Sequence, residues 1–452
     1  MGKLFGTDGI RGIVGETLTA DMAYRVGKAV AVVLAEDKKG APEITIGKDT
    51  RISSDMLESA LIAGICSVGG NVIPLGVIPT PAVAYLTIQR KADAGIMVSA
   101  SHNPYEHNGI KVFNSRGYKL SDETEARVEA LLLSDAPIME KTGSEIGRMI
   151  RGMREAHENY IDHLCATVED DLSGLRVCVD CANGAASSTA PDLFRRFKAR
   201  TDIMHAVPNG ININNRCGST HLESLQETVV NDGYDIGVAY DGDADRCLMV
   251  DEKGNIIDGD KIMAVCAMDM RRAGKLNGNA IVATVMSNLG LHEFCQREKI
   301  QLVCTDVGDR HVLEEMLACG YCIGGEQSGH MIYTEYATTG DGELTSLQFL
   351  QILKRSGKRA SELVSCCAQY PQVLVNVPVA SRRGAKEEIM ASEVLAAAIR
   401  KQEEKLGQEG RILLRPSGTE ALIRVMVEAK TEEMAHYYAE ELVNVVKSLK
   451  IS

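Results

Sequence analysis

The sequence predicts an α/β protein with three similar α/β domains, each with a mixed sheet, and a smaller C-terminal α+β domain. Three stretches share one order: an apolar strand, a polar loop, a helix and a second strand. That order favours parallel pairing and places functional loops at the carboxyl ends of strands. At 452 residues the chain is also too long for a single core.

The three repeated units follow one another along the chain. The first strand is "EITI" at 43–46, followed by the loop "GKDTRISS", a helix and the strand "NVIPLGV". The second runs from "RVCV" at 176–179 through the helix "APDLFRRF" to "TDIMHAV", and the third from "NAIVATV" at 279–285 through "LGLHEFCQRE" to "IQLVCT". The repeat is one of pattern rather than of letters, and it indicates three related α/β domains.

The last part of the chain follows a different order. "QVLVNVPV" is a predicted strand, "EEIMASEVLAAAIRKQEEKL" is helical, and "RILLRPSGTEALIRVMVEAK" predicts two strands around a tight loop. A final helix starts after Thr431 as its N-cap, with glutamates in the first turn. The predicted domains are 1–155, 156–255, 256–369 and 370–452.

Composition excludes several classes of protein. A net charge of −13 argues against a nucleic-acid partner, which would need a basic face. Residues 1–12 lack the apolar core of a signal peptide, and the uncharged stretch 59–89 is interrupted by glycines and prolines, so neither export nor a membrane partner is predicted. The 13 cysteines, including the CxxC pairs at 178–181 and 319–322, are interpreted as ordinary buried thiols of a cytoplasmic protein.

The loop "SASHNPYEHNGIK" lies between two apolar strands, and its Asn108-Gly109 predicts the start of the return. Ser101 is a weak nucleophile unless activated, whereas His102 and Lys111 could handle protons or a phosphate charge. From this loop alone, a polar hairpin with a satisfied histidine remains equally open.

The second loop, "DGDADR", carries Asp241, Asp243 and Asp245 at alternate positions. In an extended backbone alternate side chains share a face, and three carboxylates on one face need a cation. Oxygen ligands suit Mg²⁺, Mn²⁺ or Ca²⁺. An EF-hand loop is excluded because Arg246 occupies the position that requires glycine.

Two further loops offer binding groups. "GGEQSGH" holds Glu326 and Ser328, which could bind sugar hydroxyls, and His330, which could move a proton. "RPSGTE" presents Arg415 and turn amides, with Arg424 beyond it, and this set suits a phosphate. Either loop alone could be an ordinary turn. Together the four loops favour phosphoryl transfer on a sugar phosphate.

Along its whole length the chain resembles the α-D-phosphohexomutase superfamily. The resemblance lies in "FGTDGIRG", "SASHNPYEHNGIK", "DGDADR", "GGEQSGH" and "RPSGTE", which occur in the family's order. "KLFGTDGIRG", "NINNRCGSTH" and the Gln of "GGEQSGH" resemble the bacterial branch that acts on glucosamine phosphates. Ala421 departs from the proline that the family often has there, without removing a contacting group.

The resemblance implies four domains around a central cleft and a phosphoserine at Ser101. It implies one Mg²⁺ per chain, bound by the Ser101 phosphate and by Asp241, Asp243 and Asp245. It assigns proton transfer and charge stabilisation to His102, Lys111, Arg11, Arg246 and His330. It assigns substrate binding to Glu326, Ser328, Arg415, Ser417, Gly418, Thr419 and Arg424.

The implied reaction interconverts glucosamine 6-phosphate and glucosamine 1-phosphate through a 1,6-bisphosphate, which also serves as primer, and supplies precursors of the peptidoglycan wall. The expected partner is this small amino-sugar phosphate, in a monomer or homodimer. A phosphoglucomutase or phosphomannomutase would use the same loops. A metal-dependent phosphatase, or a non-catalytic sugar-phosphate binding protein on the same scaffold, is the alternative from another class.

Overall fold

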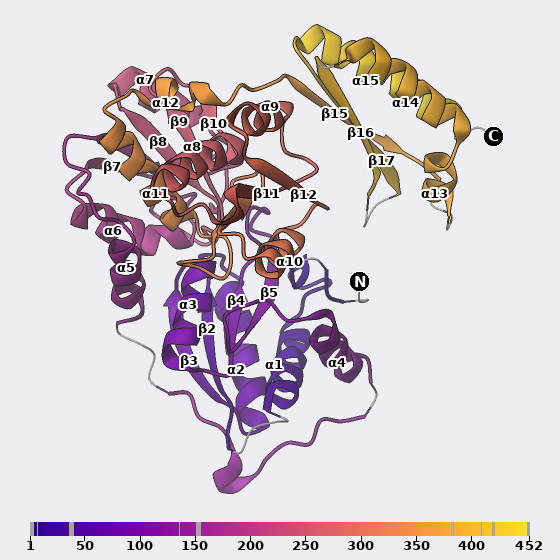
Figure 1. Cartoon of the computed structure of the whole chain (residues 1–452). Coiled ribbons are helices and arrows are strands. Elements are labelled where there is room, and N and C mark those ends of the chain that lie inside the picture. Colours follow the sequence, from indigo (N-terminus) through magenta and orange to yellow (C-terminus); the bar gives the residue numbers. More distant parts are fainter. Residues whose placement is uncertain are drawn as a thin grey trace. The chain divides into compact units, whose positions relative to one another are not determined.

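The computed structural model describes residues 4–6, 8–35, 40–134, 136–150, 155–380, 382, 384–407, 409–417 and 421–449. By compactness the chain divides into two units, of which the first comprises 1–286 and 300–366 and the second comprises 287–299 and 367–452. The first unit contains three sheets among the described residues and the second contains one (Figure 1). No helix in the described ranges is both long enough and apolar enough to cross a membrane.

The first sheet has the order β1-β5-β4-β2-β3, with β2 parallel to β3 and β4, and β5 antiparallel to both of its neighbours. Its strands are β1 (Ile10–Ile13), β2 (Glu43–Lys48), β3 (Asn71–Val77), β4 (Ala94–Val98) and β5 (His107–Asn114). Its helices are α1 (Ala20–Ala35), α2 (Ser54–Ser67), α3 (Thr80–Arg90) and α4 (Asp122–Leu133). Helices α1 and α2 cover one face and α3 covers the other (Figure 1). Because helices cover both faces, β4 is buried at every position, as its uninterrupted apolar run predicts.

The second sheet has the order β10-β9-β8-β6-β7, with β6 parallel to β7 and β8, and β9 antiparallel to both of its neighbours. Its strands are β6 (Arg176–Asp180), β7 (Arg200–Met204), β8 (Ile236–Tyr240), β9 (Cys247–Asp251) and β10 (Ile256–Ile257). The helices of this part are α5 (Ala156–Ala166), α6 (Ala190–Arg196) and α7 (Glu223–Asp232). The first two sheets therefore place a β-strand, a functional loop and an antiparallel return strand in the same arrangement.

The third sheet has the order β12-β11-β13-β14. Its strands are β11 (Ala280–Thr284), β12 (Gln301–Thr305), β13 (Ile323–Gly325) and β14 (Met331–Tyr333). Helices α8 (Gly259–Arg272) and α10 (Asp309–Cys319) pack against this sheet. Helix α11 (Gly342–Ser356) packs against α8 and against β8 and β9 of the second sheet, and α12 (Ala360–Leu363) contacts α11. Asp258 begins α8 by accepting the Lys261 N–H at 3.1 Å, and Asp341 begins α11 by accepting the Leu344 N–H at 2.9 Å.

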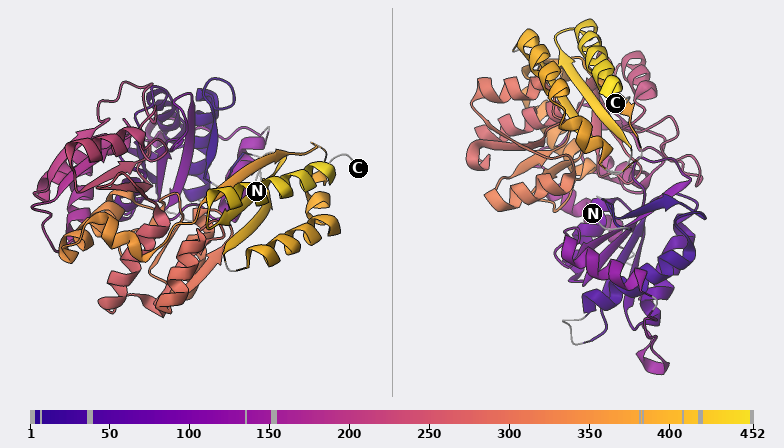
Figure 2. Two further views of the ribbon diagram at one scale, coloured as in Figure 1. Left: turned by 90° about the horizontal axis from the view of Figure 1, so that it is seen from above. Right: turned by 90° about the vertical axis from the view of Figure 1, so that its right-hand side faces the viewer.

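The second unit is a three-stranded antiparallel sheet, β15-β17-β16. Its elements are β15 (Gln372–Pro378), α13 (Ala385–Met390), α14 (Glu393–Leu406), β16 (Gly410–Pro416), β17 (Leu422–Ala429) and α15 (Glu432–Leu449). Helices α14 and α15 lie along one face of this sheet, as Figures 1 and 2 show. Thr431 caps α15 as predicted, since its Oγ1 accepts the Met434 N–H at 3.2 Å.

Helix α9 (Leu289–Glu298) joins β11 to β12 in sequence but belongs to the second unit by compactness. Its N-terminus is held there by Glu428 of β17, whose carboxylate accepts the Leu289 N–H at 2.9 Å and an Asn288 side-chain N–H at 3.2 Å. The fold class predicted from the sequence is confirmed. Helix α9 is an exception, because the sequence places it in the third repeated unit and the structure groups it with the C-terminal part of the chain. The four predicted domain boundaries stay a prediction.

Candidate functional site

Ser101 lies in the turn between β4 and β5, and its side chain is buried. Its hydroxyl donates to Asp241 Oδ2 at 2.6 Å and lies 3.3 Å from His102 Nδ1. The return strand begins there as expected, since β5 starts at His107, but Asn108 and Gly109 form no tight turn: they lie within β5, opposite Gly12 and Arg11 of β1. Gly109 is needed there because a Cβ would come within 2.6 Å of the Ser99 carbonyl oxygen.

The backbone of Ser101 is left-handed, with φ +53°. Such a conformation in a non-glycine residue costs roughly 1–3 kcal/mol and persists only where its surroundings impose it. Here the Ser101 carbonyl oxygen accepts hydrogen bonds from Arg51 and from Asn214 Nδ2, both at 2.9 Å. Neither Arg51 nor Asn214 was predicted as a functional residue, although both lie in polar loops, "GKDTRISS" and "NINNRCGSTH".

Replacing Asn214 with alanine removes one of these two donors. Because the remaining contact from Arg51 holds the loop less firmly, we expect kcat to fall by about tenfold, with little change in KM. Steady-state kinetics would measure this, and Asn212→Ala on the same segment is the matched control. A changed KM with an unaltered kcat would contradict a role in positioning Ser101.

The three aspartates come together at the start of the turn between β8 and β9. Asp241, Asp243 and Asp245 are all buried, and one carboxylate oxygen from each lies within 4.8 Å of the others. The backbone over 242–245 is a turn, with φ +55° at Ala244, and not the extended strand that the alternation suggested. Convergence therefore arises from the turn, which folds the three side chains toward one point.

Lys111 projects from β5 into this acidic cluster. Its Nζ lies 2.8 Å from Asp243 Oδ2 and 3.1 Å from both Asp245 Oδ2 and Asp8 Oδ2. Burial alone would lower the pKa of Lys111, but these three carboxylates raise it well above its ordinary value. Lys111 therefore carries a permanent positive charge within the acidic cluster.

Lys111 alone does not provide a hydrogen bond to every carboxylate oxygen of the three aspartates. Burial, reinforced by Asp245 and Asp243, raises the pKa of Asp241 well above its ordinary value. Asp243 Oδ1 and Asp245 Oδ1 are buried without a hydrogen-bond partner among the described residues. Buried oxygens without partners, in an all-oxygen donor set that includes the Ser101 hydroxyl, fit a hard divalent cation such as Mg²⁺.

His330 lies on the other side of the cluster, with Nδ1 3.6 Å from Asp245 Oδ1 and Nε2 3.4 Å from Asp309 Oδ2. Burial would lower the pKa of His330, but Asp245 and Asp309 raise it. Asp309 also joins Lys119 at 2.6 Å, and Lys119 contacts Asp8 at 2.5 Å. This chain of alternating charges was not predicted, because its members are distant in sequence and carry no local motif.

Arg246, His102 and Arg11 complete the charged surroundings. The Arg246 backbone N–H donates to Asp241 Oδ1 at 3.1 Å, and Arg11 forms an ion pair with Asp8. Burial, with Arg246 and Arg11 adding to it, lowers the pKa of His102 to about 4. At neutral pH His102 is therefore an uncharged imidazole that can accept a proton.

The "GGEQSGH" loop joins β13 to β14 and packs directly against the aspartate loop. The Cys247 N–H, next to Arg246, donates to the Gly329 carbonyl oxygen at 3.0 Å, and a Cβ on Gly329 would lie 2.3 Å from the Cys247 carbonyl oxygen. Glu326 and Ser328 stay half-exposed on this loop. The structure thus places the loop that carries both sugar-binding candidates against Cys247, the first residue of β9 after the aspartate loop.

The "RPSGTE" loop belongs to the second unit. Arg415 at the end of β16 is paired directly with Arg424 of β17, which is paired on its other side with Asn376 of β15. Ser417 begins the turn, its N–H donating to Leu422 O at 2.9 Å. Directly opposed residues share one face, so Arg415 and Arg424 place two cationic side chains on the same face of the sheet, which suits a phosphate. Gly418 and Thr419 lie outside the described residues.

Comparison with protein families agrees with this architecture. Models of phosphoglucomutase/phosphomannomutase match as α/β/α domain I over residues 2–138, domain II over 158–254, domain III over 258–370 and the C-terminal domain over 374–445. The chain therefore belongs to the phosphohexomutase family, whose members are isomerases. Within that family it groups with the phosphoglucosamine mutases: the curated one of Acetivibrio thermocellus is 51% identical over 448 residues, covering 99% of each chain.

Solved structures show the same fold. A phosphoglucomutase/phosphomannomutase family protein from Burkholderia thailandensis has a TM-score of 0.81 at 22% identity, over 99% of this chain and 97% of that one. An Aspergillus fumigatus N-acetylphosphoglucosamine mutase, solved in complex with GlcNAc-6P and magnesium, has a TM-score of 0.72 at 20% identity, over 99% and 96%.

Proposed function

We propose that the chain interconverts glucosamine 6-phosphate and glucosamine 1-phosphate, with Ser101 as the phosphoryl carrier. The observation that carries the proposal is the 2.6 Å hydrogen bond from the Ser101 hydroxyl to Asp241, at the edge of a buried cluster of three carboxylates and Lys111. The names of the relatives at 51% identity support glucosamine over glucose or mannose. A purely binding protein would need none of these groups together.

The chemistry is phosphoryl transfer in both directions. The bond from Ser101 Oγ to phosphorus breaks as a sugar hydroxyl oxygen bonds to phosphorus, the hydroxyl proton passes to a base, and the serine oxygen takes up a proton. This gives glucosamine 1,6-bisphosphate, which reverses its orientation in the site before Ser101 takes back the other phosphoryl group. His102, uncharged at neutral pH, is positioned to accept the hydroxyl proton, and His330 lies where it can serve the opposite direction.

Charge stabilisation comes from fixed cations. Lys111 is held by an ion pair with Asp243, and Arg246 is held through its backbone N–H by Asp241 while its Nε lies 3.9 Å from Asp245 Oδ1, so both cations are already in place when negative charge develops on the transferring group. When bound to Asp241, Asp243, Asp245 and the Ser101 phosphate, one Mg²⁺ would neutralise that group. The magnesium in the Aspergillus fumigatus complex supports this choice of cation.

The remaining loops would bind the rest of the substrate. Glu326 and Ser328 hold two sugar hydroxyls, and Arg415, Ser417, Gly418, Thr419 and Arg424 hold the phosphate that does not react. The same phosphate loop serves both orientations of the bisphosphate, provided that the hydroxyl contacts tolerate exchange of the two ends. The 13 free cysteines support the proposed cytoplasmic location, where thiols stay reduced.

Arg415→Ala tests the phosphate loop. Loss of a bidentate guanidinium–phosphate contact, worth about 1.5–3 kcal/mol for a charged hydrogen bond, is expected to raise KM by at least tenfold with a smaller change in kcat. Arg400→Ala on the exposed part of α14 is the matched control. An unchanged KM for glucosamine 6-phosphate would contradict the assignment.

A coupled assay of glucosamine 1-phosphate formation, with and without a trace of the 1,6-bisphosphate, tests the proposal as a whole. We expect the rate on glucosamine 6-phosphate to exceed the rates on glucose and mannose 6-phosphates, and the bisphosphate to increase it. Preference for glucose or mannose would assign the alternative mutase activity. Release of inorganic phosphate at the rate of substrate loss would instead identify a phosphatase.

A further inference from the structure

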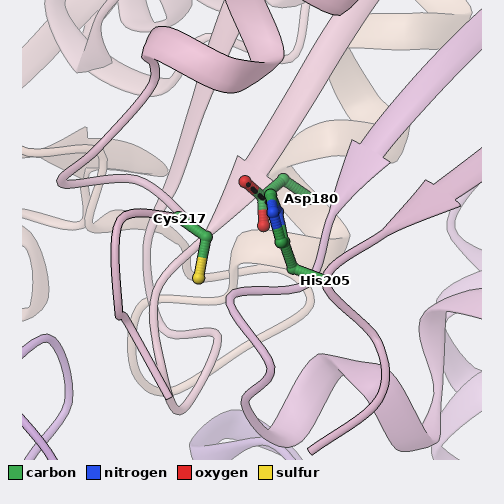
Figure 3. Close-up of side chains that lie close together, drawn as sticks. All are labelled: Asp180, His205 and Cys217. Carbon is green, nitrogen blue, oxygen red and sulfur yellow. Dashed lines mark ion pairs between the residues drawn. The ribbon is translucent and has the colours of Figure 1, made fainter. Parts of the chain in front are cut away.

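A second cluster of metal-ligating side chains lies in the same domain as the aspartate loop but uses different residues. Asp180 ends β6, His205 directly follows β7, and Cys217 lies in the loop before α7 (Figure 3). One ligand atom from each lies within 4.8 Å of the other two. Asp180 and Cys217 are fully buried, whereas the side chain of His205 is 30% exposed.

The carboxylate of Asp180 is held in a fixed orientation by the backbone. Its Oδ1 accepts the Ala182 N–H at 2.8 Å and its Oδ2 accepts the Gly218 N–H at 2.9 Å. The backbone beside His205 is fixed as well, since its carbonyl oxygen accepts the Asn183 N–H at 2.6 Å. Ligands held by a second set of hydrogen bonds are typical of built metal sites.

The histidine adds an independent observation. Its Nδ1 is buried and lies 3.0 Å from Asp180 Oδ2, yet it has no well-aligned hydrogen-bond partner among the described residues. The axis of this ring nitrogen therefore does not point at the carboxylate. Two candidate ligands that lie close together without a well-aligned hydrogen bond are both available to a cation, and Cys217 Sγ lies within 4.8 Å of a ligand atom of each.

We propose that Asp180, His205 and Cys217 form a binding site for Zn²⁺, distinct from the magnesium site at the three aspartates. A sulfur, a nitrogen and an oxygen ligand suit Zn²⁺, whereas Mg²⁺ takes oxygen ligands. Three protein ligands leave a fourth coordination position for water. The partly exposed side chain of His205 gives the metal ion access to the site from solvent. Binding displaces the thiol proton of Cys217 as the sulfur–zinc bond forms.

The site would join three segments, one of which, the segment that carries Cys217, supports the catalytic loop. Asn214, three residues before Cys217, donates its side-chain N–H to the Ser101 carbonyl oxygen at 2.9 Å. The backbone N–H of Asn214 donates to Ala182 O, two residues after Asp180, also at 2.9 Å. Zinc would therefore stabilise the segment that carries Asn214, without contacting the reacting atoms.

The experiment uses the full-length protein, reduced and stripped of metal, with Co²⁺ as a spectroscopic probe and Zn²⁺ as competitor. The wild-type protein should bind Co²⁺ with a thiolate-to-cobalt charge-transfer band that Zn²⁺ removes. Cys217→Ser and His205→Ala should abolish the band and weaken Zn²⁺ binding by about 100-fold or more, at least the loss seen for outer-shell partners. Cys304→Ser, which changes an exposed cysteine, and Asp243→Asn, which changes the magnesium site, should keep it.

Thermal unfolding gives a second measurement that does not depend on activity. Stoichiometric Zn²⁺ should raise the melting temperature of the wild-type protein and of Cys304→Ser, but not of Cys217→Ser. Absence of the thiolate-to-cobalt charge-transfer band after Co²⁺ is added to the stripped wild-type protein would overturn the proposal. So would an unchanged band in Cys217→Ser, since the thiolate would then come from another cysteine.

Discussion

Ser101→Ala is expected to lower the mutase rate by about 10⁴-fold or more, because the Ser101 hydroxyl is bound to Asp241 of the acidic cluster, whereas the other serine of the turn, Ser99, donates its hydroxyl to Asp49 Oδ2 at 2.7 Å. The same variant should lack the mass of one phosphoryl group in the intact protein. Its fold should be retained: the contacts from Arg51 and Asn214 reach the Ser101 carbonyl oxygen, which alanine keeps.

The rate comes from the coupled assay, and the phosphoryl content from intact-protein mass spectrometry. Ser59→Ala on the exposed face of α2 makes the same chemical change away from the site and should alter neither. Full activity of Ser101→Ala, or a gain of one phosphoryl mass by Ser101→Ala after incubation with the bisphosphate, would remove Ser101 as the carrier.

Asp243→Asn is expected to lower kcat by roughly 10³-fold and to raise the Mg²⁺ concentration needed for half-maximal rate. Asp243 Oδ2 accepts hydrogen bonds from Thr80 Oγ1 at 2.6 Å and Lys111 Nζ at 2.8 Å, while Oδ1 has no partner among the described residues. The amide removes one of the charges that hold the cation and presents an N–H₂ group to a lysine or to the metal.

Titration of the chelator-treated enzyme with Mg²⁺ measures both effects. The wild-type enzyme should lose its activity on chelation and regain it with Mg²⁺. Asp192→Asn, the same change at an exposed position on α6, should follow the wild-type curve. Retention of the full rate by the chelated wild-type enzyme, or an unshifted Mg²⁺ curve for Asp243→Asn, would exclude the aspartates as the metal site.

Much of the site could be predicted because its residues occur in short loops that follow buried strands. The turns after β4, β8, β13 and β16 carry most of the assigned residues, and their residue types alone indicate phosphate, metal and sugar chemistry. The supporting residues could not be predicted in this way. Asp8, Lys119 and Asp309 form their ion pairs across 111 and 190 residues of sequence, so no local spacing reveals them.

The Asn108-Gly109 pair shows why local signals fail at particular positions. Asn-Gly is a strong hairpin signal, but in β5 the glycine is required by the close approach of the Ser99 carbonyl oxygen from the neighbouring loop. For the aspartate loop the predicted convergence of the carboxylates is right but the predicted backbone is wrong. The side chains converge through a turn at Ala244 and not through strand alternation. In both cases tertiary contacts override the local preference.

By itself the sequence determined the order of strands and helices, because hydrophobic periodicity and turn residues act over a few positions. It also determined which loops carry chemistry. Only the tertiary structure decided that Ser101 meets Asp241, that α9 packs with the C-terminal unit, and that Asp180, His205 and Cys217 converge. These are meetings of distant residues, and they depend on how strands pair and elements pack, which no local pattern specifies.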